Sequence, residues 1–206
     1  MAGADRLESE AAVAAQTPKL VLASGSPQRR RLLAEAGYDF AVVPPRADVE
    51  SDSLPGESPC DLVSRLAREK ALDVAHRVGG GIVVACDTVA ACDGNVLGKP
   101  VDADDARRML TLLSGREHCV YSGLCLIALP DCTPRVRVAT TRLRMDALDP
   151  AQISEYLASG LWRGKAGAFG YQDRPGWLHI TQGSESNVIG LPLDLLADML
   201  AELPPS

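Results

Sequence analysis

A carboxylate and a lysine, residue types suited to acid–base and anion chemistry, stand at the two ends of a predicted hairpin. An apolar run of β-forming residues, 82–86, ends at Asp87, where open α/β sheets place their chemistry. The pair Asp93-Gly94 favours a type I′ turn, and the returning strand leads to Lys99. We expect the hairpin to bring Lys99 back toward the level of Asp87. A carboxylate and a lysine at one edge would suit a phosphate ester and its metal.

A second candidate site is the Ser-Gly-Ser-Pro-Gln-Arg sequence at 24–29, which follows a short predicted strand at 19–23. Ser26 is a suitable helix N-cap, and Pro27 is a suitable first residue of the helix. Free N–H groups, two hydroxyls and the Arg29 guanidinium at a helix N-terminus would make an anion site. A capped helix with solvated arginines explains the same pattern, so the spacing alone leaves both interpretations open.

Lys70 lies in a helix predicted from Ser58-Pro59 to the glycines at 79–81. It falls between Leu66 and Val74 at helical spacing, on the apolar stripe rather than opposite it. By itself this place favours a lysine that packs its stem on the core and keeps its charge in water.

The remaining segments alternate between β and α patterns. Strands are predicted at 38–43, 117–129, 133–143 and 177–181, and helices at 103–113, 150–159 and 191–203; the segment 164–173 is glycine-rich and irregular, and 183–187 is predicted to be a turn. The two long strands 117–129 and 133–143 are expected to pair antiparallel. The pattern predicts an α/β protein with a mixed sheet.

The length of 206 residues allows one domain with a large core. Residues 1–17 are Ala-rich and predicted to be a disordered extension, and residues 18–206 to be a single α/β domain. The net charge of −6 gives no general attraction to nucleic acid or to an anionic membrane. Any attraction for an anionic ligand must therefore be local.

The six cysteines include no C-x-x-C pair, which favours reduced thiols in the cytoplasm. No apolar run approaches the length of a membrane span. The acidic residues Asp5, Glu8 and Glu10 are unlike a secretory signal. These features predict a cytoplasmic protein with neither membrane nor nucleic acid as a partner.

Four ordered stretches carry a family resemblance. They are Ser24-Gly25-Ser26-Pro27-Gln28-Arg29 with Leu32-Leu33; Arg65-Leu66-Ala67-Arg68-Glu69-Lys70-Ala71; Asp87-Thr88 with Gly98-Lys99-Pro100; and Lys165-Ala166-Gly167-Ala168-Phe169-Gly170 with Gly190-Leu191-Pro192-Leu193. Together they resemble the Maf family of nucleoside triphosphate pyrophosphatases over about residues 19–200. The resemblance implies a long twisted mixed sheet with flanking helices and two lobes around a cleft, a fold related to the inosine triphosphatases.

Carried over by position, the resemblance implies roles for individual residues. Catalytic roles fall on Asp87, Lys70 and Lys99; substrate contacts on Ser24, Ser26, Arg29, Thr88 and Gln172; and metal ligation on Glu50 and Asp87. The implied metal is Mg²⁺, with Mn²⁺ as the second choice, because only hard carboxylate oxygens are offered. None of the histidines His76, His118 and His179 lies in a motif, and all three are expected to be structural.

Two departures affect the implied site. Gln28 stands where the family usually has an arginine, and Ser51 stands where an acidic residue usually follows Glu50. A competing hypothesis is therefore a member that has lost catalysis and only binds nucleotides or regulates division. Thr88 and Gln172 resemble the family branch that acts on dTTP and UTP. Two competing enzyme hypotheses are a member of the 7-methyl-GTP branch and an enzyme that resembles inosine triphosphatase. The resemblance also implies a homodimer.

Overall fold

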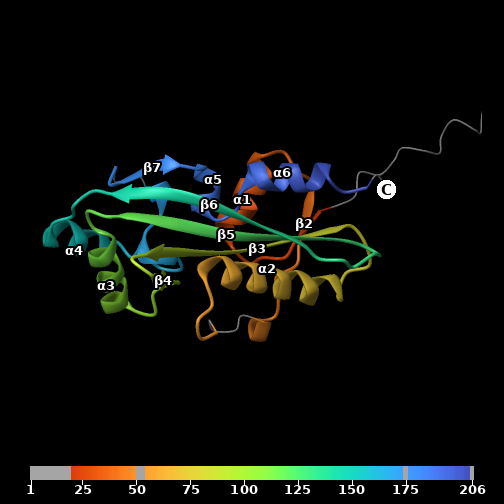
Figure 1. The fold of residues 1–206 in the computed structure, drawn as a ribbon, viewed down its shortest axis with the longest axis horizontal. Helices are drawn as coiled ribbons and strands as arrows, with labels where there is room; N and C mark the ends of the chain where they lie inside the picture. The colour runs from red at the N-terminus through yellow and green to blue at the C-terminus, as the bar shows by residue number, and fades with distance from the viewer. Residues whose placement is uncertain (1–19, 50–53, 174–175, 205–206) are drawn as a thin grey trace, which may run out of the picture.

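The computed structural model describes residues 20–49, 54–173 and 176–204. In this part of the chain, one seven-stranded sheet has the order β2-β1-β3-β5-β6-β7, with β4 paired to β3 (Figure 1). The strands are β1 (Leu20–Leu22), β2 (Phe40–Val42), β3 (Ile82–Cys92), β4 (Asn95–Leu97), β5 (Glu117–Ala128), β6 (Arg135–Met145) and β7 (Leu178–Gln182). Strand β1 runs parallel to β2 and β3, and the remaining pairs are antiparallel. The predicted mixed α/β sheet is confirmed.

The predicted end of the central strand at Asp87 is wrong. Strand β3 continues through Asp87 to Cys92, because β5 pairs with it from Ile82 to Ala91. Asp87 therefore lies in the middle of a long strand rather than at its carboxyl end. The predicted hairpin is confirmed, since Asp93 and Gly94 have φ values of 49° and 77° and connect β3 to β4.

The second edge of β3 is only partly paired. Strand β1 pairs with residues 82–84 and β4 with residues 90–92, so no strand in the described ranges pairs with residues 85–89 on this edge. Val84 accepts a hydrogen bond from the Ala23 N–H across the edge at 2.8 Å. Alternation along the strand turns the backbone N–H and C=O groups of Cys86 and Thr88 to the same side. The sheet thus has an opening beside Asp87.

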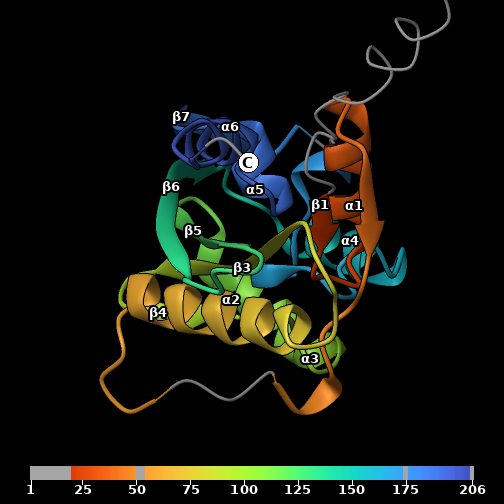
Figure 2. The ribbon, with the colours of Figure 1, turned by 90° about the vertical axis from the view of Figure 1, so that its right-hand side faces the viewer.

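Helices cover both faces of the sheet: α2 lies along one face and α1, α5 and α6 on the other, while α3 and α4 lie at one end (Figures 1 and 2). The helices are α1 (Pro27–Glu35), α2 (Pro59–Ala75), α3 (Ala103–Leu113), α4 (Pro150–Ala158), α5 (Glu185–Ile189) and α6 (Leu193–Ala201), with short 3₁₀ turns η1 (Ala47–Val49), η2 (Ala166–Ala168) and η3 (Tyr171–Asp173). The predicted N-cap Ser26 accepts a first-turn N–H, and Ser58, Asp102 and Asp149 cap α2, α3 and α4 in the same way. No helix in the described residues is long and apolar enough to cross a bilayer.

Side chains alternate between the two helical layers along β3. Val84 and Cys86 pack in the core under α1 and α6, whereas Val83 and Ala85 pack in the core under α2. The same alternation turns Asp87 toward α2, and turns the next residue away from it.

The close approach of α2 to the sheet depends on Gly123, the residue opposite Asp87 on β5. A Cβ atom at Gly123 would lie 2.1 Å from the Val63 carbonyl oxygen of α2, far inside van der Waals contact. Glycine is therefore needed here for a reason of packing, and this contact sets the distance between α2 and β5.

A separate core at the other end of the strands is formed by α3, α4 and η2, with Met109, Leu110 and Phe169 among its members. The turn predicted at 183–187 is wrong, because Ser184 accepts the Asn187 N–H and caps the short helix α5. The predicted extension at 1–17 lies outside the described residues, and the single domain from 18 to 206 stays a prediction.

Candidate active site

A cavity of about 510 Å³ lies at the opening in the sheet. Among the described residues, its lining includes five lysines and arginines and no acidic residue: Arg29, Lys70, Lys99, Arg163 and Lys165. The cavity also has apolar walls from the α3–α4 core, such as Leu113, Met145 and Phe169. A cavity with cations and an apolar wall suits a ligand that carries both a strongly anionic part and a flat, poorly hydrated part.

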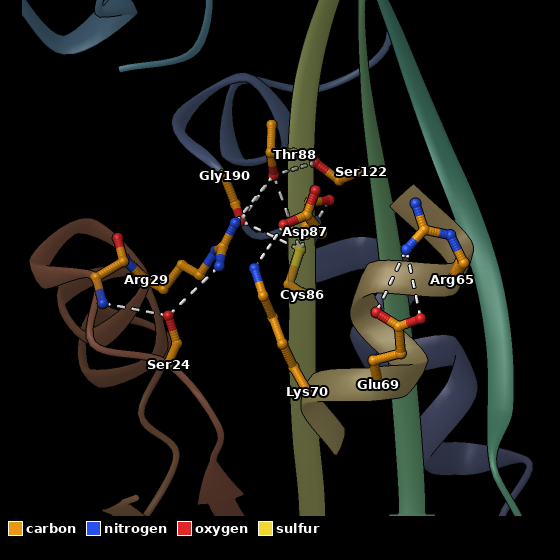
Figure 3. Close-up of polar contacts among 11 residues, drawn as sticks. Ser24, Arg29, Arg65, Glu69, Lys70, Cys86, Asp87, Thr88, Ser122 and Gly190 are labelled. Carbon is orange, nitrogen blue, oxygen red and sulfur yellow. Dashed lines mark hydrogen bonds and ion pairs between the residues drawn. The ribbon is translucent and has the colours of Figure 1, made fainter. Parts of the chain in front are cut away.

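Arg29 joins three separate segments at the basic side of the cavity. Its Nε donates to the Gly190 carbonyl at 2.8 Å, and Nη1 and Nη2 lie 3.4 Å from Ser24 Oγ and 3.3 Å from Thr88 Oγ1 (Figure 3). Ser26 Oγ accepts the Arg29 N–H at 3.4 Å, and Ser24 Oγ accepts the Ser26 N–H at 3.2 Å. The structure thus brings the predicted residues Ser24, Ser26 and Arg29 together at the N-terminus of α1.

Lys70 and Asp87 form a buried ion pair. Lys70 Nζ lies 2.6 Å from Asp87 Oδ1, and the two side chains are 5% and 12% exposed (Figure 3). The prediction that Lys70 snorkels to solvent is therefore wrong, because the carboxylate compensates its charge inside the protein. Lys70 lines the cavity and Asp87 lies beside it. Within the described residues, only Oδ1 of the carboxylate has a hydrogen bond, which leaves Oδ2 for a further partner.

Thr88 points to the face opposite Asp87 and belongs to a hydroxyl network. Its Oγ1 lies 2.8 Å from the Oγ of Ser122, a fully buried residue on β5. Neither Ser122 nor Gly190 was among the predicted site residues. The Gly190 carbonyl accepts from Arg29, and from the Cys86 thiol at 3.3 Å. Burial raises the pKa of Cys86, so its thiol stays protonated and acts as a donor.

Lys99 follows β4, and its side chain is exposed at the cavity. In the hairpin Leu97 lies opposite Ala90, so continuing the register by two residues brings Lys99 level with Thr88. Lys99 and Lys70, the partner of Asp87, line the same cavity, and the approach of Lys99 to Asp87 stays a prediction.

The glycine-rich loop (residues 164–173) places Gln172 in the cavity lining. It contains the two 3₁₀ turns η2 and η3, and Gly167 donates its N–H to the Gly98 carbonyl at 3.0 Å. The loop therefore contacts the residue that precedes Lys99. Lys165 of this loop also lines the cavity, and it was not among the predicted site residues.

Arg65 of α2 holds the segment 54–57, which follows the predicted metal ligand Glu50 in the chain. Its Nε lies 2.8 Å from Glu57 Oε1, and Nη2 donates to Glu57 Oε2 at 2.8 Å. The hydrogen bond from Arg65 lowers the pKa of Glu57 to about 2. The Leu54 N–H also donates to Glu57, so this carboxylate fixes the segment 54–57 on α2.

Glu50, the second predicted metal ligand, lies outside the described residues. Within the described residues, no group of three or more His, Cys, Asp or Glu side chains gathers as a metal site. Asp87 Oδ2 is a hard oxygen beside the cavity, which fits one ligand position of Mg²⁺.

His118 was expected to be structural, and the structure places it in the cavity lining. It is 7% exposed, and burial lowers the pKa of its imidazole. The sequence signal that could have found it is its alternation with Val120 and Ser122 on one face of β5.

These features define an α/β protein with a cationic cleft that opens through an interrupted sheet. The chain belongs to the Maf family: the family model described as Maf-like protein matches residues 19–203. It is 50% identical over 182 residues to a protein of Rhodopirellula baltica named dTTP/UTP pyrophosphatase, with 88% of this chain and 80% of that protein covered. It is 47% identical over 180 residues to a protein of the same name from Sphingopyxis alaskensis, with 85% and 92% covered.

The fold is also similar to that of a solved HAM1 protein from Coxiella burnetii. The TM-score is 0.51 at 14% sequence identity, and the match covers 90% of this chain and 100% of that one. The expected relation to that fold is confirmed, and at this identity the likeness concerns the fold alone.

Proposed function

We propose that this chain hydrolyses dTTP and UTP to the nucleoside monophosphate and pyrophosphate. The names of its relatives at 50% and 47% identity support this activity. The single observation that carries the proposal is the Lys70–Asp87 pair, 2.6 Å apart, beside a cavity lined by cations. A nucleoside triphosphate carries about four negative charges near neutral pH, which Arg29, Lys70 and Lys99 would neutralise.

The phosphates would bind at the N-terminus of α1 and between the lysines. Ser24, Ser26 and Arg29 offer hydroxyls and a guanidinium whose position the Gly190 carbonyl fixes. Lys99 reaches the cavity from the opposite side of the opening. A fixed guanidinium and a mobile ammonium would together stabilise the charge that grows on the leaving pyrophosphate.

Asp87 would orient or deprotonate the attacking water. Because Lys70 occupies Oδ1, Oδ2 is the oxygen that would accept the hydrogen bond from that water. As the water oxygen bonds to the α-phosphorus, the water gives up a proton, which Asp87 Oδ2 takes when the carboxylate acts as the base. The bond from that phosphorus to the bridging oxygen breaks, and its electron pair leaves with pyrophosphate. Lys70 holds the Asp87 carboxylate charged and oriented before the attack, so that Oδ2 is ready to accept from the water.

A divalent ion, Mg²⁺ first and Mn²⁺ second, would bind Asp87 together with Glu50 and phosphate oxygens. When bound, it would supply charge neutralisation at the phosphates.

The base would lie against the apolar wall near Phe169. Gln172 offers both a donor and an acceptor, which matches the edge of a pyrimidine. Thr88 would act at the phosphate side through Arg29, since its hydroxyl lies 3.3 Å from the guanidinium.

The test is pyrophosphate release from dTTP, UTP, CTP, 7-methyl-GTP, ITP and XTP, with Mg²⁺, with Mn²⁺ and with chelator. Asp87→Asn serves as the control. Metal-dependent cleavage of dTTP and UTP that the control lacks is expected. Preference for ITP and XTP would instead assign the chain an activity like that of inosine triphosphatase, and preference for 7-methyl-GTP would assign it to that branch of the family.

If the folded protein releases no pyrophosphate from any of these nucleotides, the result would favour a binding protein that has lost catalysis. Gln28 would then matter: it accepts a hydrogen bond from Ser26 Oγ at 3.0 Å and brings no charge to the phosphate site.

We further propose that the protein acts on the cytoplasmic nucleotide pool as a homodimer. Sedimentation velocity at micromolar concentration tests the dimer, and a monomer throughout that range would contradict it.

A further inference from the structure

Three polar side chains form a connected cluster, which we call the loop latch: Lys165, which lines the cavity, with Asp173 of the same glycine-rich loop and Tyr156 of α4. Tyr156 Oη donates to Asp173 Oδ2 at 2.5 Å. Lys165 Nζ lies 2.5 Å from Oδ1 and 2.6 Å from Oδ2 of the same carboxylate. The Lys165 and Asp173 side chains are only 13% and 6% exposed, so these charge-assisted bonds are shielded from water.

The loop latch holds Lys165 and Asp173, near the two ends of the loop, and Gly170, in its middle, to helix α4. Tyr156 donates to Asp173 at the end of the loop and accepts the Gly170 N–H at 3.3 Å. Burial, and then the hydrogen bond to Asp173, raise the pKa of the Tyr156 hydroxyl, so it stays a donor. The tyrosine ring lies 5.1 Å from the ring of Phe169, which fixes it in the α3–α4 core.

The loop backbone at Gly170 lies close to the Lys165–Asp173 ion pair. A Cβ atom at Gly170 would lie 2.7 Å from Lys165 Nζ and 2.9 Å from Asp173 Oδ2, so a larger residue would displace the ion pair. The Gly167 N–H bond to Gly98 holds the other side of the loop to the Lys99 hairpin. The loop thus has little freedom between α4 and β4.

We infer that the loop latch positions Gln172 against the substrate base and thereby sets base selectivity. Gln172 immediately precedes Asp173 and lines the cavity, whereas the charge of Lys165 is engaged by Asp173 rather than offered to phosphate. Tyr156, Lys165 and Asp173 are positioning residues, because they act through the loop. This inference rests on the proposed function, in which Gln172 contacts the pyrimidine.

Tyr156→Phe tests the inference because it removes the hydroxyl and keeps the ring. We expect KM for dTTP and UTP to rise about tenfold, the effect of losing about one buried hydrogen bond, with kcat nearly unchanged. The preference for UTP over CTP should narrow by a similar factor. Tyr38→Phe, at a tyrosine between α1 and β2, is the matched control and should leave KM and the preference for UTP over CTP unchanged.

A fall in activity that is equal for all nucleotides, or an unchanged preference, would overturn the inference. If Tyr156→Phe does not fold, Asp173→Asn, which keeps the shape and removes the charge, is measured in the same way.

Hydrogen exchange of the peptide covering 164–173 gives a second readout that needs no activity. Faster exchange in Tyr156→Phe than in the wild type is expected, and equal exchange would overturn the loop latch. A wild type that cleaves no nucleotide would refute the proposed function, while the exchange experiment would still decide on the loop latch.

Discussion

Lys70 Nζ lies 2.6 Å from Asp87 Oδ1 on one face of the sheet, while Arg29 reaches the next residue of the strand, Thr88, on the other face. Neighbouring residues of a strand point in opposite directions, so two basic groups from different helical layers flank one dipeptide. Both still line a single cavity, because the sheet is open at this level of β3. The site is therefore built through the sheet rather than on top of it.

Asp87→Asn should lower kcat for dTTP by about 10²- to 10⁴-fold, the usual effect of removing a positioned acid–base group. The variant keeps the size of the side chain and loses its charge. Steady-state pyrophosphate release measures the effect. Turnover close to the wild-type rate would remove Asp87 from the catalytic role.

Lys70→Met should reduce the free energy of unfolding by about 3–5 kcal/mol, because it leaves a buried carboxylate without its partner. Lys99→Met, at an exposed lysine of the same cavity, should change it by less than about 0.5 kcal/mol. Urea denaturation of both variants measures the difference. Equal losses would mean that the ion pair has no special part in stability.

Lys99→Ala should raise KM for the triphosphate by about 10- to 100-fold, the worth of a hydrogen bond to a charged group, and leave stability unchanged. Kinetics and a melting curve on the same preparation separate the two effects. Kinetic constants equal to those of the wild type would make Lys99 a solvated residue of the hairpin.

Gly123→Ala should destabilise the protein by at least about 1–3 kcal/mol and lower activity, because the added methyl group would force α2 away from β5. The displacement would also separate Lys70 from Asp87. Gly80→Ala is the matched control, since a Cβ atom there meets nothing within 4 Å. A melting temperature equal to that of the control would contradict the packing argument.

Stability should fall in mild acid because of His118. Burial lowers its pKa below the ordinary value of 6.5. In the unfolded chain the ring takes up a proton near that ordinary pH, but the folded protein binds this proton only at lower pH. The contribution of the neutral ring is therefore complete above about pH 6.5 and is lost as the pH falls toward the lowered pKa.

Urea denaturation of the wild type and His118→Gln between about pH 7.5 and 5.5 measures this effect. The stability advantage of the wild type should shrink toward the acid end. His76→Gln, at an exposed histidine, should show no such trend. A constant difference between wild type and His118→Gln would show that this imidazole is not the group that titrates.

Local signals in the sequence were enough to predict most elements. The cap at Ser26 and the turn at Asp93-Gly94 depend on neighbouring residues only, so their positions were predicted correctly. The end of β3 was not, because its length is set by pairing with β5, a strand that follows about 30 residues later in the chain.

The residue pattern alone could not show which side chains are in contact where the partner of a residue is distant in the chain. The position of Lys70 on an apolar stripe was predicted correctly, but its partner lies on another element, and no helical pattern contains that information. The same holds for Ser122, which bonds Thr88, and for Gly190, which bonds Arg29. Arg29 and Gly190 are 161 residues apart in the chain. The roles of Glu50 and of the metal stay predictions.

The short strands β1 and β4 act as spacers whose lengths determine how much room a substrate has. Among the described residues, β1 pairs with residues 82–84 of β3 and β4 with residues 90–92, and Ser24, Thr88 and Lys99 beside the interval between them line the cavity. If either strand were extended by two residues, its backbone would fill part of that interval. Insertions or deletions near residues 22–24 and 97–99 would therefore change the width of this interval.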